Sequence, residues 1–228
     1  MGVYHHPMTD IAPSEMTLDE LREVLAPHVA ANAVFDGWSD RALGDAADTI
    51  GIPRARAKLV FPDDGIGMID AWFGALDREM ERRNPASELS LLKIRDRIRR
   101  LILTRLEIAR PQREAVRRAL AKLALPTNIA RATKLGWRTA DMMWRLAGDQ
   151  SSDFSHYSKR ATLAAVYAAT LIVWLDDESD GQADTKAFLD RRVEGIMRFE
   201  RAKARLKPDP ERHFSFARFL GRLRYPDL

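Results

Sequence analysis

The stretch AADTIGIPRARAKLVFPDD, residues 46–64, predicts how the N-terminal part of the chain folds. Gly51 is typical of the end of a short helix over residues 41–50, because helices commonly stop at a glycine. Pro53 fits the first turn of a second short helix over residues 54–61, where the missing backbone N–H is not needed. Two short helices joined by a glycine turn form the centre of a helix-turn-helix arrangement.

The flanking sequence completes this arrangement. Thr17 or Ser14 can cap a helix over residues 18–35, whose apolar positions keep helical spacing, and another helix is expected over residues 66–83. The whole segment resembles the N-terminal domain of TetR-type regulators, in which a small-residue pair, here at positions 46–47, and a turn glycine let two helices cross closely. The resemblance implies a TetR-like fold.

The rest of the chain also predicts helices, because strand signals with a two-residue period are absent. We expect an all-α fold with a degenerate helix-turn-helix domain (15–85), a helical ligand-binding and dimerisation bundle (86–206) and a C-terminal amphipathic helix in a basic tail (207–228). The expected long helices cover residues 89–109, 111–125, 129–146, 154–175 and 185–206, and a final segment covers 211–225. On the first of these, the side chains expected to face solvent are Arg95, Arg99, Arg100 and Arg105.

The composition narrows the function. The chain has 228 residues, no cysteine, five histidines and a formal net charge of +4. The absence of cysteine excludes disulfides, zinc–thiolate sites and thiol nucleophiles. The sequence contains no Gly-x-Ser-x-Gly, His-Glu-x-x-His or Gly-x-x-x-x-Gly-Lys motif, and no Glu-x-x-His pair of a di-iron bundle. We therefore expect no catalytic or metal site, no cofactor and no enzymatic activity.

The sequence also bears on location. Residues 1–7 lack the basic and apolar regions of a secretory signal. The longest uncharged apolar stretch, residues 161–175, is shorter than the about 20 residues that a membrane-spanning helix needs. We expect a soluble protein of a reduced compartment.

The basic residues of the second short helix leave two interpretations open. Arg54, Arg56 and Lys58 can contact phosphates or guanine edges if they face a major groove. Residues 33–64, however, contain six Asp or Glu against four Lys or Arg, whereas affinity for DNA depends mainly on neutralising its phosphates. This balance favours structural reuse of the fold, and a TetR-type ligand-responsive transcriptional regulator is the alternative function.

The helix expected over residues 154–175 is apolar around most of its circumference, which indicates burial on several sides. The pattern alone favours an ordinary core helix. Together with neighbouring methionine and tryptophan side chains it also suits a site for a flexible apolar ligand, because such side chains adapt to irregular shapes. The candidate lipid-binding residues are Trp137, Met142, Leu163, Tyr167, Leu171 and Trp174.

The tail combines aromatic and leucine side chains at helical spacing with several arginines. A basic amphipathic helix of this kind can lie in a bilayer interface. Docking of the same face on the protein's own body is an equally open interpretation. The candidate membrane-binding residues are Phe216, Phe219, Leu220, Leu223, Arg218 and Arg222.

The run DMMWRLAGDQSSDFSHYSKR, residues 141–160, continued by residues 163–167 and 185–193, looks like the ubiquinone biosynthesis accessory family called Coq-nine. The segment Ala-Gly-Asp-Gln-Ser-x-Asp-Phe is highly specific, and the likeness covers about residues 15–206. The resemblance implies a non-catalytic, TetR-like homodimer that has lost gene regulation and binds no nucleic acid. It implies binding of an isoprenoid, quinone or phospholipid ligand, and presentation of the membrane-borne substrate to the di-iron demethoxyubiquinone hydroxylase.

The same resemblance implies a hydroxylase-binding surface at the end of one helix and the start of the next. Eukaryotic members have tryptophan where His156 stands, so Tyr157 is the better aromatic anchor here. The resemblance further implies a cytoplasmic protein peripheral to the inner face of a bacterial cell membrane, corresponding to the mitochondrial matrix side in eukaryotic relatives. Carried over by position, the candidate partner-binding residues are Asp141, Met143, Asp153, His156, Tyr157 and Arg160.

Overall fold

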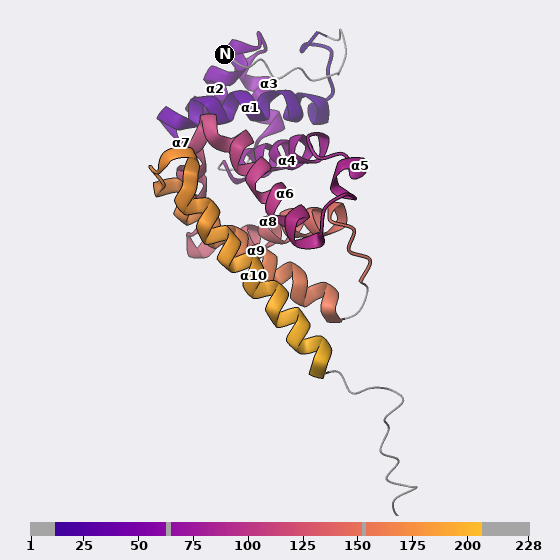
Figure 1. The fold of residues 1–228 in the computed structure, drawn as a ribbon. Coiled ribbons are helices and arrows are strands. Elements are labelled where there is room, and N and C mark those ends of the chain that lie inside the picture. The colour runs from indigo at the N-terminus through magenta and orange to yellow at the C-terminus, as the bar shows by residue number, and fades with distance from the viewer. Residues whose placement is uncertain (1–11, 63–64, 152–153, 207–228) are drawn as a thin grey trace, which may run out of the picture.

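The computed structural model describes residues 12–62, 65–151 and 154–206, and every regular element in these ranges is helical (Figure 1). The expected all-α fold is therefore confirmed. The helices are α1 (Leu18–Asp36), α2 (Asp40–Thr49), α3 (Arg54–Val60), α4 (Ile66–Arg82), α5 (Ala86–Leu89), α6 (Ile94–Ala109), α7 (Arg113–Leu123), α8 (Ile129–Leu146), α9 (Phe154–Asp176) and α10 (Ala183–Leu206).

Side-chain caps set the start of the first two helices. The Glu20 N–H donates to the Thr17 hydroxyl at 3.3 Å, while the Thr17 N–H donates to the Glu20 carboxylate at 2.8 Å. This reciprocal pair is a capping box, which satisfies two backbone donors at the helix start. Thr17, and not Ser14, is thus the cap of α1. In α2 the Ser39 hydroxyl accepts from the Ala42 N–H.

The helix-turn-helix arrangement forms as the sequence predicts, with α2 and α3 packed against α1. Gly65 then allows the chain to enter α4 beside Trp38. Its φ of +90° is unfavourable for residues with a side chain, and a Cβ at this position would collide with the Trp38 carbonyl. The ring centre of Trp38 in turn lies 5.3 Å from that of Trp72 of α4, with the two rings tilted, and the Trp38 indole N–H donates to the Ala115 carbonyl of α7. The N-terminal helices are therefore fastened to the rest of the molecule.

The helix expected over residues 89–109 is interrupted, and that prediction is wrong at its N-terminal end. A short α5 ends at Leu89, and a turn precedes α6, which begins at Ile94. The reason is that the guanidinium of Arg97 donates to the carbonyls of Ser90 and Leu92 at 3.1 and 2.9 Å. These contacts satisfy the carbonyls of the turn without a continuous helix.

The lower part of the molecule is built by α6, α8, α9 and α10, with α10 crossing α9 and α6 diagonally (Figure 1). The hydrophobic core runs without interruption from α1 to α10, so residues 15–85 and 86–206 share it. The division into domains at these positions stays a prediction. The proposed tail residues 207–228 and Asp153 lie outside the described residues. Among the described helices, none is both long and apolar enough to cross a bilayer.

Candidate functional site

The junction between α8 and α9 holds the residues that the sequence singles out for partner binding. The chain leaves α8 through Gly148, whose φ is +89°, and the Asp149 N–H bonds back to the Trp144 carbonyl at 2.9 Å. Arg97 of α6 donates to the Ala147 carbonyl at 2.9 Å. The end of α8 is thus fixed against the α5–α6 turn, which presents a rigid base for the start of α9.

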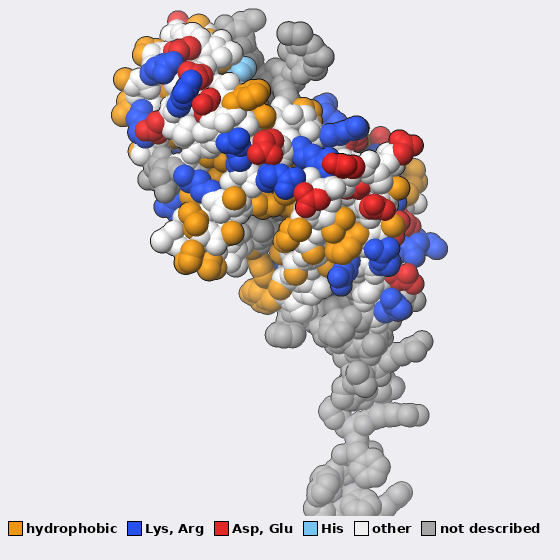
Figure 2. Space-filling view, turned by 90° about the vertical axis from the view of Figure 1, so that its left-hand side faces the viewer, with side chains coloured by type: hydrophobic (Ala, Val, Ile, Leu, Met, Phe, Trp, Pro, Cys, Tyr) orange, Lys and Arg blue, Asp and Glu red, His pale blue; other side chains and the backbone are white. Residues whose placement is uncertain are grey.

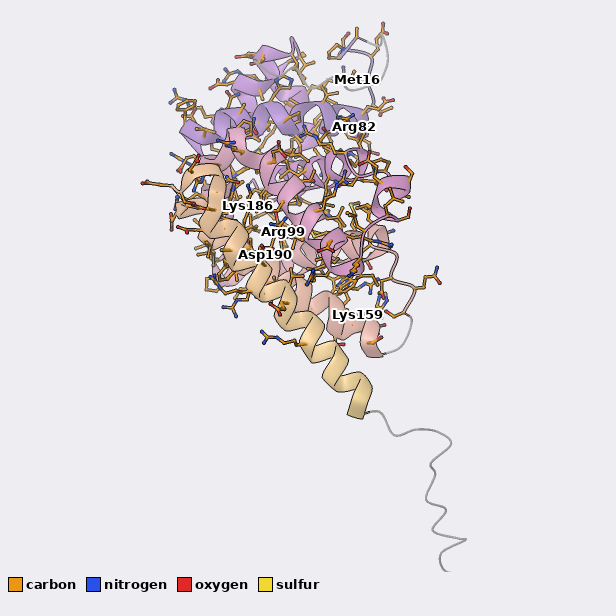
Figure 3. All side chains as sticks on the ribbon, viewed as in Figure 1. Met16, Arg82, Arg99, Lys159, Lys186 and Asp190 are labelled. Atoms are coloured by element: carbon orange, nitrogen blue, oxygen red, sulfur yellow. The ribbon has the colours of Figure 1, made fainter. Side chains whose placement is uncertain are left out.

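A network of charges ties the start of α9 to the end of α8. Arg160, only 2% exposed, donates to Asp141 at 2.6 Å and to Asp149 at 3.0 Å. Lys159, which Figure 3 labels in the first turns of α9, lies 2.8 Å from the other oxygen of Asp149. The backbone carbonyl of His156 accepts a further bond from Arg160 at 3.2 Å. Because the buried charges are paired, the junction is held in one arrangement.

The carboxyl group of Asp149 is the electrostatic centre of this network. Its burial acts to raise the pKa, but hydrogen bonds from Lys159, Ser151 and Arg160 outweigh burial and lower the pKa from 3.8 to about 2. A carboxylate with a depressed pKa stabilises the folded protein above its unfolded pKa, and this contribution is lost as the pH falls through the folded value. The pH window of the loss is therefore about 4 to 2.

We expect Asp149→Asn to destabilise the protein at neutral pH and to do so progressively less as the pH falls from about 4 to 2. The neutral amide cannot form the two ion pairs with Lys159 and Arg160. The native carboxylate also loses these ion pairs when it is protonated, so the two proteins become similar in stability at low pH. Urea unfolding of both proteins across pH 2–7 measures the difference. A difference that stays constant down to pH 2 would show that the network does not act through this charge.

An aromatic group covers the outer side of the junction. Tyr157 is 61% exposed, its ring centre lies 6.0 Å from that of Trp137 on α8, and the ring of His156 meets it edge-on at 5.2 Å. The imidazole Nδ1 of His156 lies 2.9 Å from the Ser151 carbonyl, so this ring is held in place. Tyr157 is consequently presented to solvent on a supported aromatic base.

The remaining candidate partner-binding residues differ in solvent exposure. Asp141 and His156 are partly buried, Arg160 is buried and the side chain of Met143 has no exposed surface. Asp141, His156 and Arg160 come together with Tyr157 at the junction, whereas Met143 points into the core. In this conformation Met143 and Arg160 support the surface from below, and Tyr157 is the exposed member of the group. Partner binding at these residues stays a prediction.

Most of the candidate lipid-binding residues form part of the core of the described structure or pack against it. Leu163, Tyr167, Leu171 and Trp174 on α9 are buried, while Trp137 and Met142 on α8 are half-buried. Four surface hollows among the described residues have volumes of about 250 to 350 Å³, and three of them are lined mostly by charged side chains. None of these four is lined by a candidate lipid-binding residue.

Tyr167 belongs instead to a buried polar network that the sequence does not indicate. Arg105 donates to its hydroxyl and, at 2.7 Å, to the carboxylate of Asp77. The hydroxyl of Thr139 donates to the same carboxylate at 3.1 Å. The expectation that Arg105 faces solvent is wrong, because its side chain is 2% exposed. The sequence indicates the burial of Arg105 only through spacing, because Arg105 lies three residues from both Ile102 and Ile108, which are buried on α6.

The basic side chains of α3 are bound by the protein itself. Arg54 lies 3.0 Å from Asp45 and also bonds to Asp48, and Lys58 lies 2.6 Å from Asp40. Arg56 donates to two backbone carbonyls that precede α1. On the face shown in Figure 2, basic and acidic side chains are interspersed. The helix that would read DNA in a helix-turn-helix protein thus has its charges largely compensated.

The junction and α9 fall within a segment that matches a known family. Residues 129–200 match the model of the COQ9 family. Over 182 residues, 77% of its length, this chain is 34% identical to the mitochondrial ubiquinone biosynthesis protein COQ9 of Homo sapiens and 32% identical to that of Rattus norvegicus. The chain belongs to the COQ9 family. The predicted resemblance to Coq-nine proteins is confirmed. The chain spans 57% and 58% of the length of these two relatives.

The fold has a counterpart among solved structures. A TetR transcriptional regulator from Nitrosomonas europaea ATCC 19718 superposes with a TM-score of 0.61 over 77% of this chain and 97% of the regulator. The two sequences are 24% identical. This likeness confirms the TetR-like fold. Among the described residues, no group of three or more His, Asp or Glu side chains is placed to hold a metal ion.

Proposed function

We propose that this chain is a non-catalytic accessory protein of ubiquinone biosynthesis, which binds an isoprenoid or quinone lipid and presents it to the di-iron demethoxyubiquinone hydroxylase at a membrane surface. The observation that carries the proposal is the likeness, over 77% of the chain, to proteins named ubiquinone biosynthesis protein COQ9. The α8–α9 junction lies inside the segment that matches the COQ9 family. Attachment to the membrane is assigned to the tail, residues 207–228.

The junction is the proposed contact with the hydroxylase. Aromatic side chains that are exposed on a rigid base are typical anchors of protein interfaces, because they bury a large area at a small entropic cost. Tyr157 meets this description, with Trp137 and His156 beside it. The Arg160 network fixes the backbone from which Tyr157 projects.

Lipid binding at the candidate residues requires α9 to separate from α8 and α6, since its inner side chains pack there in the described conformation. An alkyl chain that enters replaces the core contacts that are lost, so the opened form is favoured only when the lipid is bound. The proposal therefore couples lipid uptake to a change in α9. In the free protein Trp137 and Met142, both half-buried, lie at the outer edge of this region.

We expect mass spectrometry of the extracted, purified full chain to recover an isoprenoid, quinone or phospholipid. On addition of that lipid, amide hydrogen exchange in α9 should increase or redistribute, while exchange in α1 stays unchanged, because only α9 has to move. Recovery of no lipid at all would contradict the proposal. If lipid is bound but hydrogen exchange in α9 does not change, the protein still binds lipid, but the buried candidate residues are excluded as the site.

A homodimer is part of the proposal. The outward face of α9 exposes Ala161, Ala165, Ala168 and Ile172 at helical spacing. Small side chains allow close approach of a second helix, and the 62% exposure of Ile172 leaves apolar area for a partner copy to cover. DNA binding is left out of the proposal, because the charges of α3 are compensated within the protein and phosphate neutralisation dominates DNA affinity.

A further inference from the structure

The turn between α5 and α6, residues 90–93, and the first residues of α6 expose apolar side chains. Leu91 is 85% exposed and Ile94 47%, so Leu91 presents more of its surface than any other large hydrophobic side chain of the described residues. Lys93 and Arg95 lie on either side of Ile94 and are also exposed. Residues 90–95 include no acidic residue, and Arg95 lies 3.3 Å from the carboxylate of Asp96, the next residue of α6. Two exposed apolar side chains close to two exposed cations are a combination that folding of the monomer does not require.

The turn is held rigidly by Arg97. One guanidinium group donates to the carbonyls of Ser90, Leu92 and Ala147, at 3.1, 2.9 and 2.9 Å. Two of these carbonyls belong to the turn and the third to the end of α8, so the turn cannot fold inward without breaking its two bonds to a guanidinium that α8 also holds in place. The exposure of Leu91 is therefore built into the structure, and the side chain is already ordered for a contact.

The turn precedes the end of α6 that points along α10 toward residue 206. Arg99 of α6 is paired with Asp190 of α10, and Figure 3 shows the two labels side by side where these helices meet. One turn earlier on α6, Arg95 lines the same hollow as Glu194, which follows Asp190 along α10. The two helices are thus antiparallel. The N-terminal end of α6, with the turn, points in the direction in which α10 runs toward residue 206.

We propose that the α5–α6 turn is a second membrane anchor, which places Leu91 in the interface of an anionic bilayer with Lys93 and Arg95 at the lipid phosphates. The inference rests on the proposed function, in which the tail brings the protein to a membrane. An inserted apolar side chain gains from leaving water, and nearby cations gain from the negative surface potential. A protein partner would find one convex leucine with two cations nearby in the chain, whereas an anionic bilayer complements both the apolar side chain and the cations.

The absence of cysteine from the chain allows a direct test. The full-length variant Leu91→Cys, labelled with an environment-sensitive fluorophore, is mixed with vesicles of phosphatidylcholine and phosphatidylglycerol in a ratio of 7:3. The label should brighten about twofold or more and be quenched by spin-labelled acyl chains, as expected for entry into an apolar phase. The matched control is Leu59→Cys, an exposed leucine on α3, whose label should not respond. A silent label at position 91 would overturn the inference.

A second variant measures binding without a label. Leu91→Asp should lower the vesicle partition coefficient about tenfold, the scale set by burial of one leucine, while Leu59→Asp changes it less than about twofold. Equal partition of the native chain and Leu91→Asp would overturn the inference. The same holds for a label at position 91 that responds to the purified hydroxylase and not to vesicles, because the turn would then be a protein contact.

A labelled Phe219→Cys variant, in the tail, distinguishes failure of this inference from failure of the proposed function. A response at position 219 without one at position 91 rejects the turn as an anchor and leaves the proposed function standing. Silence at both positions rejects the membrane attachment on which the proposed function itself depends.

Discussion

Replacement of Arg105 by methionine is expected to lower the free energy of unfolding by about 3–5 kcal/mol, the range found when one partner of a buried ion pair is removed. Arg105 and Asp77 are each 2% exposed and lie 2.7 Å apart. Without the guanidinium, the carboxylate of Asp77 stays buried with Thr139 and a distant Arg138, at 3.8 Å, as its remaining partners. Neither replaces the lost charge-assisted bond.

Urea denaturation followed by circular dichroism measures this effect, and α6 offers a matched control. Arg99→Met removes the same chemical group from the same helix, but its ion pair with Asp190 is exposed on both sides and should contribute about 0–1 kcal/mol. The double variant Asp77→Leu and Arg105→Met should recover much of the loss, because it removes both buried charges. Equal effects of Arg105→Met and Arg99→Met would contradict the assignment of Arg105 as a core residue.

Substitution of Tyr157 by alanine should weaken association with the hydroxylase about tenfold to a hundredfold, the range of an interface anchor. The ring is 61% exposed, so its removal leaves the core of this protein intact. Binding is measured by titration calorimetry with the purified hydroxylase, and lipid content by mass spectrometry of the same samples. The lipid content should not change.

The control for this prediction is Phe35→Ala, which removes another exposed aromatic ring, 78% accessible at the end of α1. It should leave hydroxylase binding within about twofold of the native value, because single exposed contacts outside an interface contribute little. A loss of binding that is accompanied by an equal loss of lipid or of stability in Tyr157→Ala would give Tyr157 a structural role. Unchanged binding would remove the junction from the proposed interface.

The helices could be predicted closely from the sequence because their signals are local. The expected spans 129–146 and 154–175 agree with α8 and α9 to within one residue, as do the spans over the first four helices. These signals are proline and glycine at helix ends and the spacing of apolar residues. Each acts over a few residues, so the sequence alone contains the information. The error at residues 89–93 arose because Arg97 binds the carbonyls of that segment, a tertiary arrangement shared with the end of α8.

The candidate site was predictable only in part. The motif around residues 147–154 located the α8–α9 junction, since it is contiguous in the chain. Which residues of the junction face solvent was not predictable. Tyr157 and Arg160 are three positions apart on the same helix, and only the packing around them makes one exposed and the other buried. Likewise, an apolar pattern over α9 shows that the helix is buried but cannot show whether protein or ligand fills the space beside it.

The sequence by itself determined the helical fold, the positions of the turns and the resemblance to the COQ9 family, all of which depend on residues close together in the chain. Only the tertiary structure decided which charges are buried and which apolar side chains are exposed. Arg105 meets Asp77 from 28 positions away and Tyr167 from 62, while Leu91 stays in solvent. Helical periodicity assigns a residue to a face, but the energy of that residue depends on the distant partner that folding places opposite it.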